Sequence, residues 1–250
     1  MLGLISKSIF IGAGTGFLAG LTGMGGGVIL VPVFYLFYAF PIKQAIGTSL
    51  SVIVFTAISA LLSHAKSGKV DLKIAAIIIL FGIVGAQAGA LLTCRLPDSA
   101  VKTVFLLLVG GLGYKMWFEK ESAVTSPFLF CAKSIWKIAV IGFAGGFVSG
   151  MGGIGGAVLL VPLLHLCLGV SMNVAIATTL AAVFCNALSG SIGYFGRGFV
   201  DFHVAFLVAL GSVPAAPFGA RLSIKLSQKT LRRIFAGVLI LAGISVLVRR

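Results

Sequence analysis

Two short glycine runs are the part of this sequence whose residue types could bind a ligand. They read GMGGG at residues 23–27 and GGIGG at residues 152–156, and each precedes an apolar stretch that ends in proline. Glycine lets backbone N–H groups approach a ligand closely, and an interrupted helix exposes unpaired N–H groups and a positive dipole end. We predict that a small anion binds through Gly23, Gly25, Gly26, Gly27, Gly153, Gly155 and Gly156. The alternative is close helix packing through small residues.

Small polar side chains follow each glycine run at the same distance. The segments are AIGTSLSV (residues 45–52) and AIATTLAA (residues 175–182). Hydroxyl groups suit the oxygen atoms of an oxyanion, although Ser and Thr can also bond back to their own helix. Two helical turns later, Thr56 and Asn186 occupy equivalent positions, and Gln87 lies inside another apolar stretch, where a buried amide needs partners. The predicted substrate contacts are Thr48, Ser49, Thr178, Thr179, Asn186 and Gln87.

Acidic residues are scarce, and their positions narrow the range of functions. All five fall in expected loops or at the starts of expected spans: Asp71, Asp98, Glu119, Glu121 and Asp201. No carboxylate pair, HExxH motif or nucleophile elbow occurs, so we predict no enzyme, no catalytic residue, no metal site and no cofactor. A pathway without acids is poor for cations and suits an anion. We expect Asp71 and Asp201, each preceding an apolar run, to cap helices.

The composition places these residues in a membrane. Hydrophobic residues make up 59% of the 250 residues and charged residues 10%, with a net charge of +14 and a mean hydropathy of +1.18. Several apolar runs approach the length of about 20 residues that crosses a bilayer. The basic residues lie mostly between these runs, as in loops beside anionic headgroups. We predict a multi-pass protein of the cytoplasmic membrane with the lipid bilayer as its partner, and no nucleic-acid binding.

The chain is an internal duplication. Residues 142–162 align with residues 12–32 without a gap, and eleven residues are identical at an offset of 130. We therefore predict a first transmembrane repeat at residues 1–120, a linker at residues 121–133 and a second repeat at residues 134–250. Duplicated membrane proteins of this kind are typically secondary transporters with a site between the repeats, near the membrane midplane. A homodimer is left open.

The predicted fold is all-α, with three ordinary spans and one unusual element in each repeat. The expected spans are residues 44–63, 72–93, 100–118, 174–194, 202–220 and 230–248. The unusual elements, residues 4–40 and 134–169, would each form a helix over about 50 Å long, against a bilayer core of about 30 Å. Each must be either a broken helix that crosses once, giving parallel repeats, or a hairpin with the glycines at its tip, giving inverted repeats. The distribution of Lys and Arg slightly favours inverted repeats.

The doubled motif resembles one known family. GMGGGVILVP and GIGGAVLLVP, together with the GTS and ATT openings of the next spans, are similar to the TauE/SafE family of sulfite and organosulfonate exporters. The resemblance implies a secondary transporter that moves a small sulfur-containing anion by alternating access. It places the family's glycine element on residues 23–27 and 153–156, although Ala157 stands where the first copy has Gly27. The alternatives are a different small metabolite, the import of sulfur anions, or a membrane scaffold that does not transport.

Overall fold

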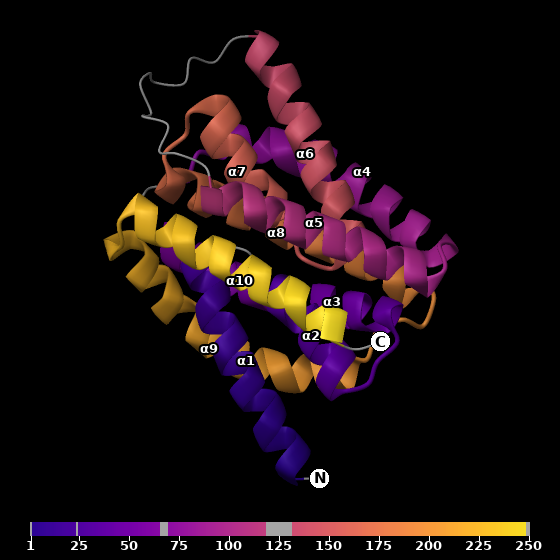
Figure 1. Ribbon diagram of the computed structural model, residues 1–250. Coiled ribbons are helices and arrows are strands. Elements are labelled where there is room, and N and C mark those ends of the chain that lie inside the picture. Colours follow the sequence, from indigo (N-terminus) through magenta and orange to yellow (C-terminus); the bar gives the residue numbers. More distant parts are fainter. Residues whose placement is uncertain (1, 24, 66–69, 119–131, 249–250) are drawn as a thin grey trace.

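The computed structural model, which describes residues 2–23, 25–65, 70–118 and 132–248, is all-helical in those residues (Figure 1). The first half of the chain contains α1 (Leu2–Thr22), α2 (Gly27–Phe37), α3 (Ile42–Ala65), α4 (Leu72–Arg95) and α5 (Asp98–Phe118). The second half contains α6 (Ala132–Gly152), α7 (Ala157–Leu168), α8 (Met172–Phe195), α9 (Phe202–Lys225) and α10 (Gln228–Val248). Each helix of the second half begins 130 residues after its counterpart in the first half. Most of the predicted linker, residues 121–133, lies outside the described residues.

Six of the described helices are long and apolar enough to cross a membrane. These stretches are Ile5–Thr22, Ile42–His64, Leu72–Arg95, Ile135–Gly152, Met172–Phe195 and Phe202–Lys225. They lie in α1, α3, α4, α6, α8 and α9, and the chain is therefore a multi-pass membrane protein. The predicted spans at residues 100–118 and 230–248 form helices α5 and α10, which pack against each other (Figure 1).

Aspartates begin two of the long helices. Asp71 accepts hydrogen bonds from the backbone N–H groups of Lys73 (3.0 Å) and Ile74 (3.1 Å) at the start of α4. Asp201 accepts a hydrogen bond of 3.0 Å from the N–H of Val204 at the start of α9. Both satisfy backbone donors that a helix leaves unpaired at its first turn. The predicted helix caps are confirmed.

The first helix of each half packs on a helix of the other half. A Cβ added to glycines of α1 would strike the backbone of α9, in the order Gly12 on Val208, Gly16 on Ser212 and Gly20 on Ala216. In α6 the order is Gly142 on Ile78, Gly146 on Gly82 and Gly150 on Ala86, all in α4. Both numbers rise together, so the two helices of each pair run in the same direction. These glycines serve close helix packing, as in small-residue membrane interfaces.

Helices α3 and α8 cross in the core in opposite directions. Ser51 hydrogen-bonds Ser191 (2.7 Å), whereas Gly47, four residues earlier on α3, lies against Tyr194, three residues later on α8. Most of the side chains along both helices are buried. The antiparallel pair of α3 and α8 forms the central layer of the fold, and the glycine runs pack against it.

The unusual element of the first half turns back on itself. Gly26, just before α2, lies beside Ala19 of α1, while the hydroxyl of Tyr38, just after α2, is 2.6 Å from Ser8 Oγ near the start of α1. Helix α2 therefore returns along α1 and the glycines form the tip. With 11 residues, α2 extends only about 16 Å. The proline that ends each apolar motif lies inside the helix that follows the glycines: Pro32 in α2 and Pro162 in α7.

Candidate functional site

The segments that join α1 to α2 and α6 to α7, which we call the glycine links, adopt a backbone conformation that requires glycine. Their φ angles are positive at Gly23 (73°), Gly25 (69°), Gly26 (86°), Gly153 (67°), Gly155 (74°) and Gly156 (80°). Side chains with a Cβ rarely adopt this left-handed region. The links therefore interrupt the helical backbone between Thr22 and Gly27, and between Gly152 and Ala157.

Both links lie deep between α3 and α8. A Cβ added to Gly25 would lie 2.7 Å from Ile53 and 2.8 Å from Val183, which are midway along their two 24-residue helices. A Cβ added to Gly153 would lie 2.9 Å from the Cα of Ile46. Since α3 and α8 are each long enough to cross the membrane, the first link reaches mid-depth.

The two links meet each other. A Cβ added to Gly27 would strike the carbonyl oxygen of Gly153 and lie 2.7 Å from the Cα of Ile154. Ser49 donates a hydrogen bond of 2.9 Å to the same carbonyl oxygen. The structure thus brings together predicted site residues from both halves: Gly27, Ser49 and Gly153.

The helices that follow the links have uncapped N-termini. Gly26 precedes α2 and Gly156 precedes α7, and neither helix has a side-chain cap or an acidic residue in its first turn. Such a terminus presents backbone N–H groups and the positive end of the helix dipole. This is the geometry that binds anions. Among the described residues, the buried polar side chains are hydroxyls, Asn186 and His64, so no buried carboxylate opposes a negative charge there.

The predicted threonines have structural partners. Thr48 accepts a hydrogen bond from the backbone N–H of Asp201 (3.1 Å), and Thr178 accepts one from that of Asp71 (3.0 Å). Each hydroxyl thus anchors the start of a helix in the opposite half. Thr179 donates to carbonyl oxygens of its own helix, at 2.8 Å from that of Ala175. This is the back-bonding alternative, and substrate contact by these three residues remains a prediction.

Gln87 joins α4 to α8. Its Nε2 atom donates a hydrogen bond of 2.7 Å to the carbonyl oxygen of Ser189, and the side chain is half-buried. Ser189 in turn donates to the carbonyl oxygen of Ile83 (3.0 Å). The amide that sequence alone left without a partner therefore holds two helices together, and a role toward a substrate remains a prediction.

Asn186 differs from every other predicted site residue because its amide is unpaired. It is fully buried in α8, and neither Oδ1 nor Nδ2 has a hydrogen-bond partner among the described residues. Its neighbour on α4 is Gly82, at which an added Cβ would strike Oδ1. The equivalent Thr56 is bonded to Ser212 Oγ at 2.7 Å. An unpaired buried amide costs free energy, which a bound ligand or water would recover.

Sequence reasoning missed one residue of this kind. Ser149 is fully buried in α6, and its Oγ has no partner within the described part of the chain. Its Cβ lies 3.3 Å from the position that a Cβ on Gly156 would take, at the start of α7. Residue 149 corresponds to Ala19 in the first repeat. The sequence feature that could have identified Ser149 is this change from alanine in the first repeat to serine in the second, beside the glycine run.

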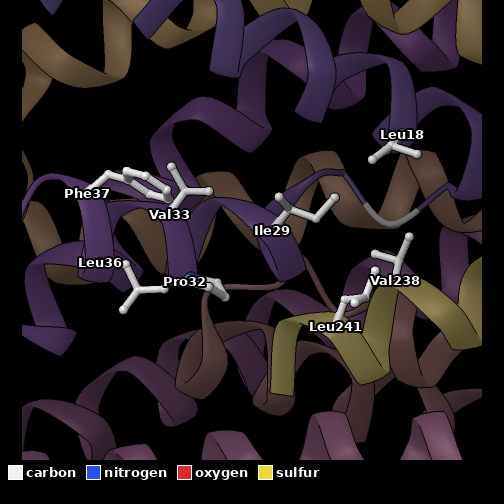
Figure 2. A pocket seen from close by; sticks show the side chains of 8 residues that line it. All are labelled: Leu18, Ile29, Pro32, Val33, Leu36, Phe37, Val238 and Leu241. Carbon is white, nitrogen blue, oxygen red and sulfur yellow. The ribbon is translucent and has the colours of Figure 1, made fainter. Parts of the chain in front are cut away.

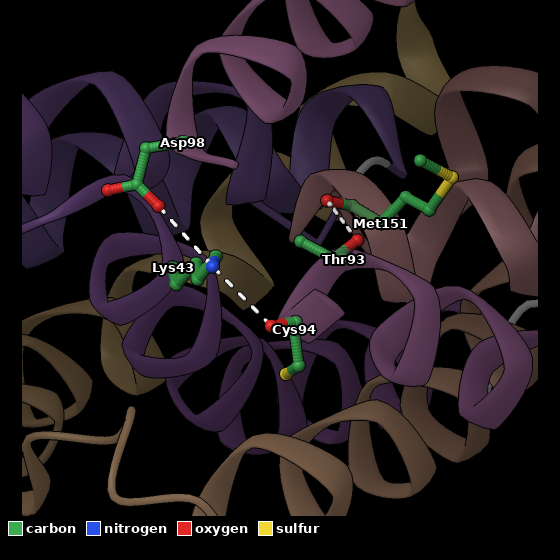
Figure 3. Close-up of polar contacts among 5 residues, drawn as sticks. All are labelled: Lys43, Thr93, Cys94, Asp98 and Met151. Carbon is green, nitrogen blue, oxygen red and sulfur yellow. Dashed lines mark hydrogen bonds and ion pairs between the residues drawn. The ribbon is translucent and has the colours of Figure 1, made fainter. Parts of the chain in front are cut away.

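An ion pair fixes the helix that carries Ser49. Lys43, in the first turn of α3, lies 3.5 Å from the carboxylate of Asp98 and donates to the carbonyl oxygen of Cys94 (3.4 Å) (Figure 3). In the same view Thr93 donates to the carbonyl oxygen of Met151, at 3.5 Å (Figure 3). These contacts tie the start of α3 and the end of α6 to the end of α4.

An apolar pocket lies beside α2, and none of the link glycines lines it. Its volume is about 290 Å³, and Figure 2 shows side chains of α1, α2 and α10 around it. The lining residues are Leu18, Ile29, Pro32, Val33, Leu36, Phe37, Val238 and Leu241. None of them carries a polar side chain, so the pocket does not suit an anion.

The six membrane-length helices, together with the family and the relatives that match the sequence, define a multi-pass membrane transporter. The family described as Sulfite exporter TauE/SafE matches residues 8–246, and the chain belongs to it. This chain is similar to the probable membrane transporter protein YunE of Bacillus subtilis, with 30% identity over 94% of both chains. It is also similar to YdhB of the same species (30% identity; 82% of this chain, 85% of YdhB) and to MJ0441 of Methanocaldococcus jannaschii (25%; 98% and 96%), both named as probable membrane transporters. No solved structure matches.

Proposed function

We propose that this protein is a secondary transporter that moves a small anion, sulfite or an organosulfonate, across the cytoplasmic membrane. The observation that carries the proposal is the meeting of two glycine links deep between α3 and α8, where Gly27 lies against Gly153. Each link precedes an uncapped helix N-terminus, which favours a negative charge. The family description supplies the class of cargo.

Alternating access would come from two inverted repeats. Helices α3 and α8 are counterparts at an offset of 130 and run in opposite directions. A two-fold axis in the membrane plane relates such a pair, and inverted repeats are typical of transporters with a midplane site. The α1–α9 and α4–α6 pairs are each held by glycine contacts, so each can move as a unit around the site. Inverted repeats also agree with the turning back of α2.

The glycine links would bind the anion in place of water. Backbone N–H groups at the starts of α2 and α7 would replace the hydration of the oxyanion, and Ser49 would hold the Gly153 carbonyl oxygen away from it. Irregular backbone at membrane depth is tolerated where it lines a cavity inside the protein. The links would thus serve both as the site and as the hinge of each hairpin.

Transport in proteoliposomes tests the proposal. We expect purified protein to move radiolabelled sulfite or sulfoacetate with saturation, and Gly25→Val and Gly155→Val to abolish the flux because both residues have positive φ. Gly14→Val is the matched control, because a Cβ there meets nothing within 4 Å. Flux that survives both link substitutions would remove the glycine site. Saturable flux of a different metabolite would change the cargo, and no flux of any anion would favour a scaffold.

A further inference from the structure

The two halves differ in the polar groups around their links, although their backbones correspond. In the second half, Ser149 Oγ and both amide atoms of Asn186 are buried without hydrogen-bond partners in the described residues. In the first half, residue 19 is alanine and Thr56 is bonded to Ser212. At these compared positions, the unpaired groups therefore lie in the second half, at Ser149 and Asn186.

One of the unpaired groups, that of Ser149, lies close to the start of α7, and Asn186 is linked to it through α4 and α6. The Cβ of Ser149 is within 3.3 Å of the Cβ position of Gly156, the residue that precedes α7. Asn186 contacts Gly82 of α4, and Gly82 contacts Gly146 of α6, less than one turn before Ser149. Helix α6 thus carries Ser149 beside the start of α7 and, three residues earlier, Gly146 beside the α4 glycine that Asn186 contacts.

We propose that the two halves of the site contribute unequally: the second link is surrounded by the side-chain ligands Ser149 and Asn186, whereas the first link contributes backbone N–H groups alone. This inference rests on the proposed function. A serine hydroxyl and an asparagine amide both donate hydrogen bonds, and an oxyanion accepts them. The N–H groups at the start of α7 supply the remaining donors.

The chemistry of the first half explains why it is not an equivalent site. Ala19 offers no donor. The Thr56 hydroxyl donates to the carbonyl oxygen of Val52 (3.0 Å) and can accept a hydrogen bond from the Ser212 hydroxyl (2.7 Å). A ligand there would have to break a buried hydrogen bond before it gained one. The transporter would therefore hold its cargo on one side of its pseudo-symmetric centre.

Cysteine labelling tests the asymmetry without depending on transport. In a background without native cysteines, Ser149→Cys and Ala19→Cys would be treated in membranes with 2-sulfonatoethyl methanethiosulfonate, an anionic thiol reagent that carries a sulfonate group. We expect the cysteine at position 149 to react at least ten times faster than the one at position 19, and added sulfoacetate, whose sulfonate group does not react with the reagent, to slow the reaction. Equal rates at the two positions, or no reaction at 149, would overturn the inference.

Transport kinetics then test the ligands. Ser149→Ala and Asn186→Leu should each raise the KM for sulfite about tenfold, the value of a hydrogen bond to a charged group. The matched change at the counterpart contact between α3 and α9, Thr56→Val with Ser212→Ala, should leave KM within about twofold. Unchanged KM in both second-half variants would overturn the inference even if the protein transports sulfite. Selective labelling at position 149 without sulfite transport would instead reject the cargo and keep the half-site.

Discussion

The contact between α3 and α9 and the contact between α4 and α8 are counterparts that end in different chemistry. Ser59 donates to the carbonyl oxygen of Val213 (2.7 Å), and Ser189 donates in the same way to that of Ile83 (3.0 Å). One turn away, a hydroxyl pair fills the first contact, while Asn186 lies unpaired in the second. The serine contact that holds the helices together thus recurs in both halves, whereas the polar groups one turn away from it differ.

The largest loss of stability is expected at the glycine contacts that the two halves share. Gly16→Ala and Gly146→Ala place a methyl group against the backbone of Ser212 and Gly82, so both should destabilise the protein by at least about 1–3 kcal/mol, the cost of overpacking. Gly14→Ala, which points into open space, should be neutral or slightly stabilising. Thermal unfolding of the detergent-purified variants measures this. A tolerated alanine at one position only would show that the two helix pairs are not equivalent.

The next largest change in stability should differ in sign between the equivalent positions 56 and 186. Thr56→Val leaves Ser212 buried with a lost partner and should cost about 1–3 kcal/mol of stability. Asn186→Leu removes two unpaired buried atoms and should raise the Tm. Both changes keep a similar side-chain volume. Thermal unfolding without added anions is the measurement, and a lower Tm for Asn186→Leu would show that its amide has a structural partner.

Removing either of the two aspartate helix caps should lower the stability of the protein by a similar amount. Asp71→Ala and Asp201→Ala each remove a carboxylate that accepts N–H groups at a first turn, and each should lower stability by about 1 kcal/mol. Asp→Asn at the same positions is the control, because asparagine also caps helices. Unfolding midpoints that fall in one half only would separate the starts of α4 and α9.

The smallest effect concerns the ion pair of the first half. Lys43→Asn gives α3 the residue that α8 has at position 173, and removes the contact with the half-exposed Asp98. We expect a loss below about 1 kcal/mol that shrinks as salt is added. Unfolding at low and high ionic strength tests this. A large loss that salt does not reduce would mean that the Lys43 contact with the Cys94 carbonyl oxygen matters more than the charge pair.

Local signals in the sequence predicted much of the backbone. Consecutive glycines within an apolar stretch too long for one crossing predicted the links and left two geometries open, of which the structure has the hairpin. An aspartate before an apolar run predicted each cap, because capping depends only on the next three residues. The helical membrane fold followed from the apolar composition, and the family followed from the repeated motif.

Tertiary partners could not be predicted from the same patterns. Nothing near Thr48 or Thr178 in sequence indicates that each hydroxyl meets an aspartate of the other half, 153 and 107 residues away in the chain. The glycines of α1 recur in α6, but a spacing of four fits packing on any helix. Ser149 was missed because the comparison of repeats emphasised identities, whereas the informative position is one at which the copies differ.

The crossing of α1 onto α9, and of α6 onto α4, makes the two halves dependent on each other. Residues 1–120 alone would leave the glycine-lined faces of α1 and α4 without the helices that cover them, and residues 134–250 would do the same for α6 and α9. Separately synthesised fragments would therefore have to find each other in the bilayer, in opposite orientations, before either became stable. Because each half supplies helices that cover the other, we expect the two halves of this protein to fold together.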